Sequence, residues 1–455
     1  MNRQLRKNDI ITLKITSMTA QGSGVGKTED GIVVFVPFSA IGDELEVRVL
    51  KVKKTYAYGK IERIITPSDS RIENDCEAFG KCGGCTYRHI SYNSEKEIKR
   101  TRVQDALERI GGLKDIKVNE VVGSDKTDRY RNKAQLPCRN TENGVEFGYY
   151  ASHSHRIVPC ADCLLQPESF NKVSEITRAF MNETAQSAYD EKTGKGKLRH
   201  LYIRYAEKTD ELMICYVVNG NGLKQEDKLI KNLKDELPNL KSVIFNSNTE
   251  NTNVVLGSKN RTAYGKDHIE DILCGKKFKI SPLSFYQVNR AQAEKLYTIA
   301  KNYADLKGDE VLLDLYCGTG TIGLTMAQSC KKLIGVEIIG DAVNDAYKNA
   351  EHNEIKNAEF ICGDAKFAAE KLRADGVKPD VIIVDPPRKG LDSELIGTIV
   401  GMKPEKIVYV SCDSETLARD LRLFTEKNYS VKEITPVDLF SRTPHIENVV
   451  LMSRQ

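Results

Sequence analysis

The sequence predicts a multidomain α/β protein with a small N-terminal β-barrel, a central α+β domain and a C-terminal domain built on a doubly wound parallel sheet. Three observations predict this architecture. The N-terminal part consists of short β-runs separated by glycine turns, the middle mixes β-runs with helical stretches, and the C-terminal part alternates strand and helix regularly. At 455 residues, the chain is also too long for one ordinary core.

Residues 1–66 are expected to form the barrel, because short strands at such spacing close into a barrel or pack as a sandwich. This part holds eleven Lys or Arg against seven Asp or Glu, and its segment Lys51–Lys60 interleaves cations with tyrosines. Cations neutralise phosphates and aromatic rings stack on bases, so the segment is either a nucleic-acid contact or an ordinary solvated hairpin. The β-runs are Ile10–Ile15, Gly31–Pro37, Asp43–Val52 and Ala57–Ile65.

Residues 67–288 are expected to form the central domain. It opens with a cysteine- and glycine-rich segment at 71–90, followed by a predicted helix at about 94–111 that a glycine pair ends. Further helical stretches lie near 168–190 and 223–236. The β-runs between them are Lys133–Cys138, Val145–Tyr150, Leu201–Tyr205, Leu212–Val218, Ser242–Phe245 and Asn253–Leu256.

The cysteines indicate metal ligation or catalysis. The chain has twelve of them, no apolar run as long as a membrane span, and no apolar signal-peptide core after its basic first residues. We therefore expect a cytoplasmic protein, in which cysteines stay reduced. Cys76, Cys82 and Cys85 have the spacing of metal ligands, with a fourth ligand from Cys160 or Cys163. Pairing Cys82-x2-Cys85 with Cys160-x2-Cys163 would instead make a zinc knuckle and leave Cys76 unused.

Residues 289–455 are expected to form the doubly wound sheet. Helical stretches separate most of its β-runs, as in a parallel sheet. The last two runs leave no room for a helix between them, so we expect an antiparallel hairpin at the sheet edge. The runs are Glu310–Leu315, Lys332–Glu337, Ala358–Cys362, Val381–Val384, Lys406–Val410, Val431–Val437 and Val449–Met452.

Acidic side chains follow three successive strands of this predicted sheet. Ligands of doubly wound folds bind beyond the carboxyl ends of the strands, and the glycines of the turn Cys317–Gly323 let the backbone approach one closely. Glu337 ends the second strand, where an acid can accept hydrogen bonds from ribose hydroxyls, and Asp364 ends the third. Asp385, before two rigid prolines, ends the fourth. We therefore expect an adenosyl cofactor at this edge.

Cys412 follows the fifth strand, at the same edge as Asp385. A thiolate that adds to carbon 6 of uracil makes carbon 5 nucleophilic enough to take a methyl group, and a base must then remove the carbon 5 proton. Glu447 and His445, before the last strand, are the candidate bases, and chemistry alone does not choose between them. The alternative for Cys412 is a buried structural thiol.

These motifs resemble those of the RNA uracil-5 methyltransferases, and among them the iron–sulfur-containing enzymes of 23S rRNA. The resemblance covers nearly the whole chain. It implies that the barrel is a TRAM/OB-like RNA-binding module and that the C-terminal part is a Rossmann-like, S-adenosylmethionine-dependent methyltransferase domain. Tyr316 stands where phenylalanine is common, and Asp413 where asparagine is common. The ordered motifs are Phe285–Asn289, Asp314–Gly318, Asp385–Arg388, Ser411–Asp413 and His445–Glu447.

The resemblance also implies roles for individual residues. Cys412 would be the nucleophile, and Glu447 rather than His445 the base. A [4Fe–4S] cluster would have a folding or RNA-positioning role, since methyl transfer requires no electron. The cluster would be held by Cys76, Cys82, Cys85 and Cys163, and S-adenosylmethionine by Gln287, Tyr316, Thr321, Glu337, Asp364 and Asp385.

The substrate that the resemblance implies is 23S ribosomal RNA, methylated at uridine 1939, uridine 747 or both in the standard 23S numbering. A relative that methylates the tRNA T-loop lacks the barrel and the cysteine cluster, which favours rRNA over the tRNA alternative. Two further classes stay open. An exocyclic-amine methyltransferase would bind the amine at Asp385–Pro387 and would not need Cys412, and a non-catalytic RNA-binding protein would bind no cofactor. We expect a monomer with no DNA or membrane partner.

Overall fold

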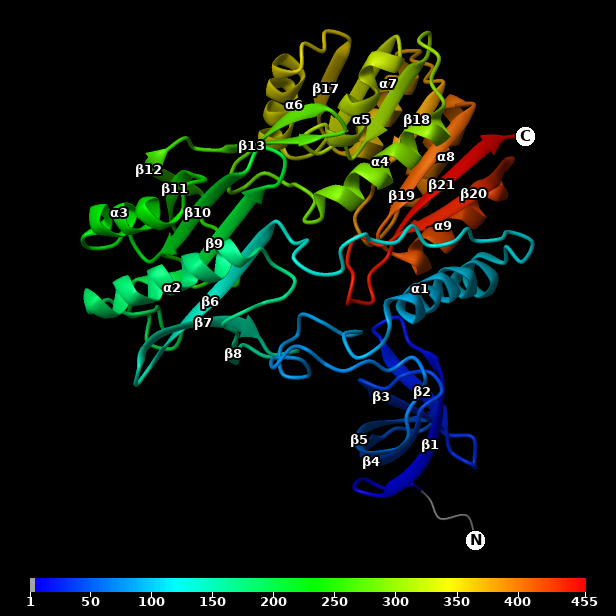
Figure 1. The fold of residues 1–455 in the computed structure, drawn as a ribbon. Coiled ribbons are helices and arrows are strands. Elements are labelled where there is room, and N and C mark those ends of the chain that lie inside the picture. Colours follow the sequence, from blue (N-terminus) through cyan, green and yellow to red (C-terminus); the bar gives the residue numbers. More distant parts are fainter. Residues whose placement is uncertain (1–4) are drawn as a thin grey trace.

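The structure, a computed structural model, describes residues 5–455 and contains a closed barrel and two large sheets within that range (Figure 1). The multidomain α/β prediction is therefore confirmed. The first four residues of the segment 1–66 lie outside the described residues. The domain boundaries after residues 66 and 288 stay predictions.

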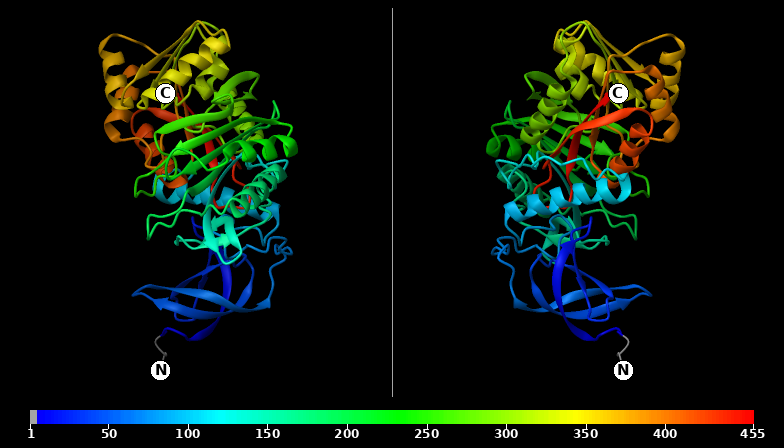
Figure 2. Two further views of the ribbon diagram at one scale, coloured as in Figure 1. Left: turned by 90° about the vertical axis from the view of Figure 1, so that its left-hand side faces the viewer. Right: turned by 90° about the vertical axis from the view of Figure 1, so that its right-hand side faces the viewer.

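The barrel is formed by five strands in the order β1-β2-β3-β5-β4, closed by pairing of β1 with β4. Alternate residues of its strands point inward, as in Glu44–Val52, so that small aliphatic side chains fill the interior. The side views of Figure 2 place the barrel at one end of the molecule. Its strands are β1 (Ile10–Met18), β2 (Ser23–Lys27), β3 (Val33–Pro37), β4 (Glu44–Val52) and β5 (Tyr56–Thr66).

Helix α1 (Tyr92–Ala106) continues into one π-helical turn, η1 (Leu107–Gly111), which ends at Gly112 with φ of 71°. Ser91 caps its N-terminus by accepting a hydrogen bond from the Ser94 amide. Although α1 precedes the central sheet in sequence, Val103 and Leu107 belong to the core beneath helix α9 (Ser414–Thr425). Helix α1 thus packs on the C-terminal part of the chain.

The central sheet has seven strands in the order β12-β11-β10-β9-β6-β7-β8. Helices α2 (Glu168–Glu183) and α3 (Glu226–Glu236) pack together on one of its faces. The predicted run Asn253–Leu256 is wrong, because it is a loop fixed by Asn248, whose side chain donates to the carbonyls of Val254 and Val255. The strands are β6 (Lys133–Thr141), β7 (Gly144–Tyr150), β8 (Ile157–Pro159), β9 (Leu198–Ala206), β10 (Glu211–Val218), β11 (Leu240–Ser247) and β12 (Lys259–Gly265).

The C-terminal sheet also has seven strands, in the order β17-β16-β15-β18-β19-β21-β20. The first five are parallel, and β21 runs antiparallel to both β19 and β20, which confirms the predicted edge hairpin. The chain order reverses between β15 and β18, so a ligand site is expected there. The strands are β15 (Val311–Leu315), β16 (Lys332–Glu337), β17 (Ala358–Cys362), β18 (Val381–Val384), β19 (Lys406–Ser411), β20 (Tyr429–Val437) and β21 (Glu447–Arg454).

Helices cover both faces of this sheet, as Figure 1 shows. The connections from β15 to β19 each contain at least one helix, which the parallel arrangement requires. The helices are α4 (Arg290–Ala304), α5 (Thr321–Met326), α6 (Gly340–His352), α7 (Ala365–Ala374), α8 (Ser393–Met402) and α9, with a short 3-10 turn, η2 (Ala327–Ser329), after α5. No helix within residues 5–455 is long and apolar enough to cross a membrane.

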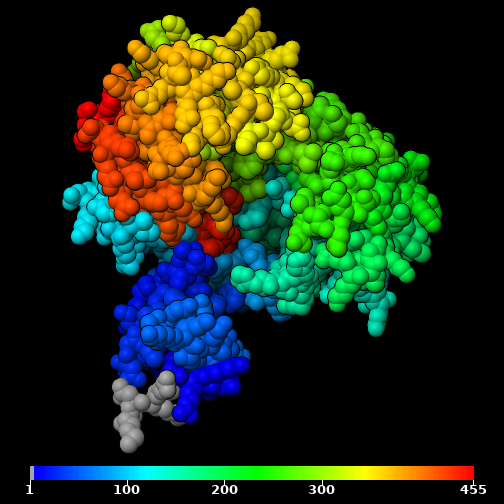
Figure 3. Space-filling view, turned by 180° about the vertical axis from the view of Figure 1, so that it is seen from behind, coloured from blue at the N-terminus to red at the C-terminus, as the bar shows by residue number. Residues whose placement is uncertain are grey.

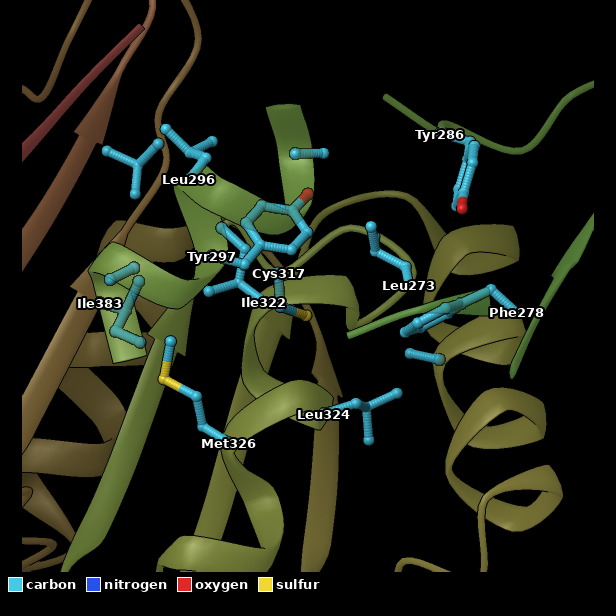
Figure 4. Close-up of a cluster of buried hydrophobic side chains, with 14 of the residues drawn as sticks. Leu273, Phe278, Tyr286, Leu296, Tyr297, Cys317, Ile322, Leu324, Met326 and Ile383 are labelled. Atoms are coloured by element: carbon cyan, nitrogen blue, oxygen red, sulfur yellow. The ribbon is translucent and has the colours of Figure 1, made fainter. Parts of the chain in front are cut away.

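One hydrophobic core joins the central and C-terminal parts. It includes Tyr202 and Met213 of the central sheet together with Leu312 of β15. Figure 4 shows a part of this core, in which Phe278 of the ribbon β13–β14 (Ile269–Leu273, Lys276–Ile280) and Tyr297 of α4 lie around the start of α5. This continuous packing holds the two sheets together, and the cavity described next lies between them.

Candidate active site

A cavity of about 1120 Å³ opens at the carboxyl ends of the C-terminal strands. It lies where Figure 3 shows the molecule hollowed between the C-terminal part and the central part. Its walls come from the strand ends of the C-terminal sheet, from the segment 283–288, and from the start of β6. Seven of the eight predicted catalytic and cofactor residues line it, namely Gln287, Tyr316, Glu337, Asp364, Asp385, Cys412 and Glu447.

Glu337, the last residue of β16, is oriented by the backbone of the neighbouring turns. One carboxylate oxygen accepts from the Gly318 amide at 3.1 Å and the other from the Ile339 amide at 2.8 Å. The turn after β15 makes this possible because Tyr316 and Gly318 both adopt positive φ, at 66° and 56°. Each carboxylate oxygen keeps a lone pair for a further donor, so Glu337 can accept from two hydroxyls of a ligand.

Asp364 and Asp385 occupy the next two strand ends. Asp364 is the N-cap of α7 and accepts from the Lys366 amide at 3.0 Å, which fixes its side chain at the cavity wall. Asp385 directly follows β18, at the point where the strand order reverses. Three acids from three strand ends therefore meet at one cavity, as the strand-end pattern predicted.

Thr321 does not line this cavity. It is the first residue of α5 and is buried, with its hydroxyl 3.3 Å from that of Tyr297. The Tyr297 hydroxyl in turn interacts with the side chain of Gln287, which does reach the cavity. Thr321 is thus connected to the cavity only through the side chains of Tyr297 and Gln287. No sequence pattern distinguishes such a buried position from one that lines the cavity.

Cys412 and Glu447 are neighbours because of strand register. In the antiparallel pair β19–β21, Val410 is opposite Val449 and Ser411 is opposite Asn448, so the next position brings Cys412 opposite Glu447. Cys412 is half-buried, and Glu447 is only 6% exposed. A thiol and a carboxyl group therefore face one pocket from adjacent strand ends, which is the arrangement that a nucleophile with a separate base requires.

The cavity raises the pKa of each of its reactive acids. Burial raises the pKa of Cys412 to about 11, and the nearby Glu447 and Asp385 add to the shift while Arg388 opposes it. Burial, reinforced by Asp385, raises the pKa of Glu447 to about 8, again opposed by Arg388. Burial alone raises the pKa of Asp385 to about 7. These groups favour a cationic ligand, because a nearby positive charge stabilises their ionised forms.

His445, the other candidate base, also lines the cavity. Its Nδ1 lies 3.4 Å from an Arg388 guanidinium nitrogen. Burial, with repulsion from Arg388 and other cations, lowers the pKa of His445 to about 4. A group with so low a pKa is a weak proton acceptor, so the electrostatics favour Glu447 as the base.

Sequence reasoning missed the cations of the cavity wall. Lys133, the first residue of β6, and Arg131 just before it line the cavity together with Arg388 and Lys389 of the loop after β18. Burial, together with repulsion from the neighbouring Arg204 and Arg131, lowers the pKa of Lys133 to about 8. Arg388 lies in the motif Asp385–Arg388 at a strand end, but nothing in the sequence indicates that residues 131 and 133 reach the same cavity.

The cysteines that were predicted to bind metal surround a second, smaller cavity of about 80 Å³. Arg131 lines this cavity as well as the large one. Among the described residues, no group of three or more His, Cys, Asp or Glu side chains is arranged to hold a metal ion. The thiols around the cavity are those of Cys76, Cys82, Cys85, Cys160 and Cys163.

Comparison with known proteins identifies the family. The sequence model of the tRNA (uracil-5-)-methyltransferases matches residues 91–455, and that of the TRAM domain matches residues 4–61. The chain belongs to the tRNA (uracil-5-)-methyltransferase family. It is therefore an S-adenosylmethionine-dependent RNA uracil-5 methyltransferase, and the TRAM match agrees with the closed N-terminal barrel. The resemblance inferred from the motifs is confirmed at this level.

Relatives and solved structures support the assignment over the full chain. A Clostridium tetani protein described as an uncharacterized RNA methyltransferase is 44% identical over 99% of this chain and 97% of its own length. A similarly described protein from Halalkalibacterium halodurans is 41% identical over 98% of each chain. The crystal structure of Pyrococcus abyssi tRNA (uracil-54, C5)-methyltransferase in complex with S-adenosyl-L-homocysteine has a TM-score of 0.78 and 29% identity, covering 97% of this chain and 100% of that one.

The Pyrococcus abyssi structure corrects one step of the sequence argument. A match over 97% of this chain must include the barrel, and the protein is described as acting on tRNA. The presence of a barrel therefore does not separate rRNA from tRNA enzymes in this family.

Proposed function

We propose that the protein methylates carbon 5 of a specific uridine of 23S rRNA, at position 1939, 747 or both. The main support for methylation of uracil carbon 5 is the position of Cys412 opposite Glu447, at the cavity between the two sheets. The choice of 23S rRNA rests on the resemblance to iron–sulfur-containing rRNA enzymes and on the five thiols around one small cavity. A tRNA T-loop uridine is the second candidate, and the likeness to the Pyrococcus abyssi enzyme favours it.

In the proposed reaction, Cys412 first loses its proton to solvent, and its thiolate bonds to carbon 6 of the uracil. The electron pair of the carbon 5–carbon 6 double bond then moves into the ring as an enolate. Carbon 5 then takes the methyl group of S-adenosylmethionine, the sulfur–methyl bond breaks with its electron pair left on sulfur, and S-adenosylhomocysteine leaves. Glu447 accepts the proton from carbon 5, the double bond forms again, and the Cys412 thiolate leaves. Every bond and proton is accounted for without an electron donor.

The free Cys412 thiol is not ready for this step, because its pKa is raised to about 11. A bound sulfonium cation would stabilise the thiolate and the carboxylates around it. The guanidinium of Arg388 already opposes the rise of the pKa at both Cys412 and Glu447. Arg388 therefore has an electrostatic role in the nucleophilic step in addition to any contact with RNA.

The remaining predicted residues would hold S-adenosylmethionine. Glu337 has lone pairs free for the ribose hydroxyls, and Asp364 stands at the next strand end, where the adenine edge would lie. Gln287, Tyr316 and Asp385 line the same cavity and would complete the cofactor site. Thr321 would act indirectly, by orienting the side chain of Gln287 through the hydroxyl of Tyr297.

We infer that the cysteine cavity holds a [4Fe–4S] cluster rather than a zinc ion. Zinc needs four ligands that converge on one centre, whereas a cuboidal cluster takes one thiolate at each of four separate irons. Five thiols around one cavity could supply such separate ligands. Arg88 and Arg131 line the same cavity and would balance its negative charge. The proposed ligands are Cys76, Cys82, Cys85 and Cys163, and the cluster would supply structural support.

The barrel would contribute to RNA binding. The rings of Phe35, Tyr56 and Tyr58 lie within 5.6–5.7 Å of one another, and Tyr58 is 42% exposed. The basic segment Lys51–Lys54 is next to them, at the end of β4. Exposed rings beside cations suit stacking on unpaired bases with contacts to the phosphates.

Two experiments test the proposal. Mapping 5-methyluridine in rRNA and tRNA from a deletion strain identifies the substrate: loss from 23S rRNA supports the proposal, and loss from tRNA alone supports the second candidate. A denaturing gel with labelled RNA tests the chemistry. Glu447→Gln should accumulate a covalent enzyme–RNA band, Cys412→Ala should give neither band nor product, and a band with His445→Gln instead would identify His445 as the base.

A further inference from the structure

The loop that leads to Glu447 is held mainly by a distant part of the chain. Residues 438–446 connect β20 to β21, and within this loop Phe440 and His445 line the large cavity. Asn289, Gln292 and Tyr130 each donate to a backbone carbonyl of the loop, and helix α1, more than three hundred residues earlier in the sequence, supplies the buried charges that bind it. The centre of the arrangement is Lys99, whose side chain is 1% exposed.

Lys99 has all three of its ammonium donors engaged. Its Nζ donates to Glu95 Oε1 at 2.7 Å and to Asp438 Oδ1 at 2.7 Å, and both carboxylate side chains are completely buried. The third donor reaches the backbone carbonyl of Phe440 at 3.2 Å. One ammonium group therefore joins helix α1 to both the side chain and the backbone of the loop.

The carboxylates of Asp438 and Glu95 accept further hydrogen bonds that hold the loop. Asp438 Oδ2 accepts from the Tyr92 hydroxyl at 2.7 Å and from the Ser441 hydroxyl at 2.8 Å. Glu95 Oε1 also accepts from the Arg442 amide at 2.8 Å. These contacts fix the loop at three successive places before it reaches Glu447.

This network is costly in free energy, because two carboxylates and one ammonium group are removed from water. Apolar side chains of similar volume generally stabilise a core as well or better, so stability alone does not account for three buried charges. What such a network provides is directional fixing of the groups that it binds. Here those groups are the carbonyl of Phe440 and the amide of Arg442, both in the loop that carries the cavity residues.

We propose that Lys99 is a positioning residue that sets the approach of Glu447 to the carbon 5 proton. The inference rests on the function proposed above. Cys412 follows β19 and is held by its own neighbours, since Asp413 caps helix α9 and its amide donates to the Ser411 hydroxyl. Helix α1 reaches α9 through Arg102, which binds Glu415, and the substitution Lys99→Met leaves that contact in place. Loosening the loop should therefore leave bond formation at Cys412 nearly unchanged and slow the later proton removal. An error of about 1 Å in the placement of a catalytic group can cost about a hundredfold in rate.

The test is a single-turnover experiment with labelled RNA and saturating S-adenosylmethionine, quenched in denaturant. It measures how fast the covalent enzyme–RNA adduct forms and how fast it resolves to free product. For Lys99→Met we expect adduct formation within about threefold of the wild-type rate and resolution slowed by about tenfold or more. Arg109→Met is the matched control, because it removes an exposed cation just beyond α1, and it should leave both rates unchanged.

Each outcome decides the proposal. If Lys99→Met melts at a lower temperature but resolves the adduct at the wild-type rate, the network is merely structural and the proposal is wrong. If Lys99→Met does not fold, Tyr92→Phe takes its place, since it removes one bond to Asp438 and leaves the charges intact. Slower resolution supports the proposal, and an unchanged rate overturns it. If Glu447→Gln forms no adduct, the covalent mechanism itself fails, independently of the result at Lys99.

Discussion

Binding of S-adenosylmethionine should release protons, whereas binding of S-adenosylhomocysteine should release few. The two ligands differ by one methyl group and by the positive charge that it creates on sulfur. In the cavity, burial raises the pKa of Asp385 to about 7 and, with help from Asp385, that of Glu447 to about 8. A cation placed near them lowers both values, because it stabilises the carboxylates.

The magnitude follows from these pKa values. At pH 7, about half of the Asp385 carboxyls and about nine-tenths of the Glu447 carboxyls carry a proton. If the sulfonium lowers each pKa by about two units, nearly all of these protons leave, so binding releases about one proton per molecule. Affinity for S-adenosylmethionine should therefore rise with pH, by about tenfold from pH 7 to pH 8, and level off above pH 8.

Calorimetry in two buffers of different ionisation enthalpy measures the proton release directly. Glu447→Gln should lower the number released at pH 7 by more than half, because Glu447 holds the larger share of the protons. S-adenosylhomocysteine should show a shallow pH dependence throughout. Equal proton release by the two ligands would refute the reasoning, since it would mean that the sulfonium does not lie near these carboxyl groups.

Further predictions concern the cysteines, the barrel and the core. Protein purified without oxygen should be brown and contain iron and acid-labile sulfide. Cys163→Ser should remove the colour and Cys160→Ser should not; one zinc and no iron would contradict the assignment. Tyr58→Ala should weaken RNA binding several-fold and leave S-adenosylmethionine binding unchanged. Deletion of residues 1–66 should weaken RNA binding further and make its affinity depend less steeply on salt concentration. An unchanged RNA affinity after the deletion would show that the barrel does not bind RNA. Leu312→Ala, at a fully buried position of β15, should lower the free energy of unfolding by about 2–5 kcal/mol, measured by urea titration.

The strand-end residues could be predicted from sequence because a parallel sheet brings all its carboxyl ends to one edge. Glu337, Asp364, Asp385 and Cys412 each follow an apolar run, and the alternation with helices gives the direction of those runs. Their common cavity therefore follows from local patterns alone. Thr321 also follows a strand, but the helix that it begins turns its side chain inward, toward Tyr297, and the strand-end pattern does not predict that direction.

Contacts between segments far apart in the sequence could not be predicted from local sequence patterns. Helix α1 was assigned to the central part by its position in the chain, yet its apolar face packs on the C-terminal part and its Lys99 binds Asp438. A glutamate and a lysine four residues apart on a helix usually form an exposed ion pair, so the spacing of Glu95 and Lys99 predicts a surface pair. Only the fold shows that both are buried.

The pairing of nucleophile and base depends on the register of β21. Side chains alternate between the two faces of a strand, so a slip by one residue would replace Glu447 with Asn448 opposite Cys412 and abolish the base. Asn448 itself opposes such a slip, because it is completely buried and its side-chain amide donates to the Ser411 carbonyl at 3.4 Å. The loop network around Lys99 fixes the other end of the same segment. The base is thus held by strand pairing after it and by buried charges before it, whereas Cys412 stands between β19 and helix α9, whose first turn Asp413 caps.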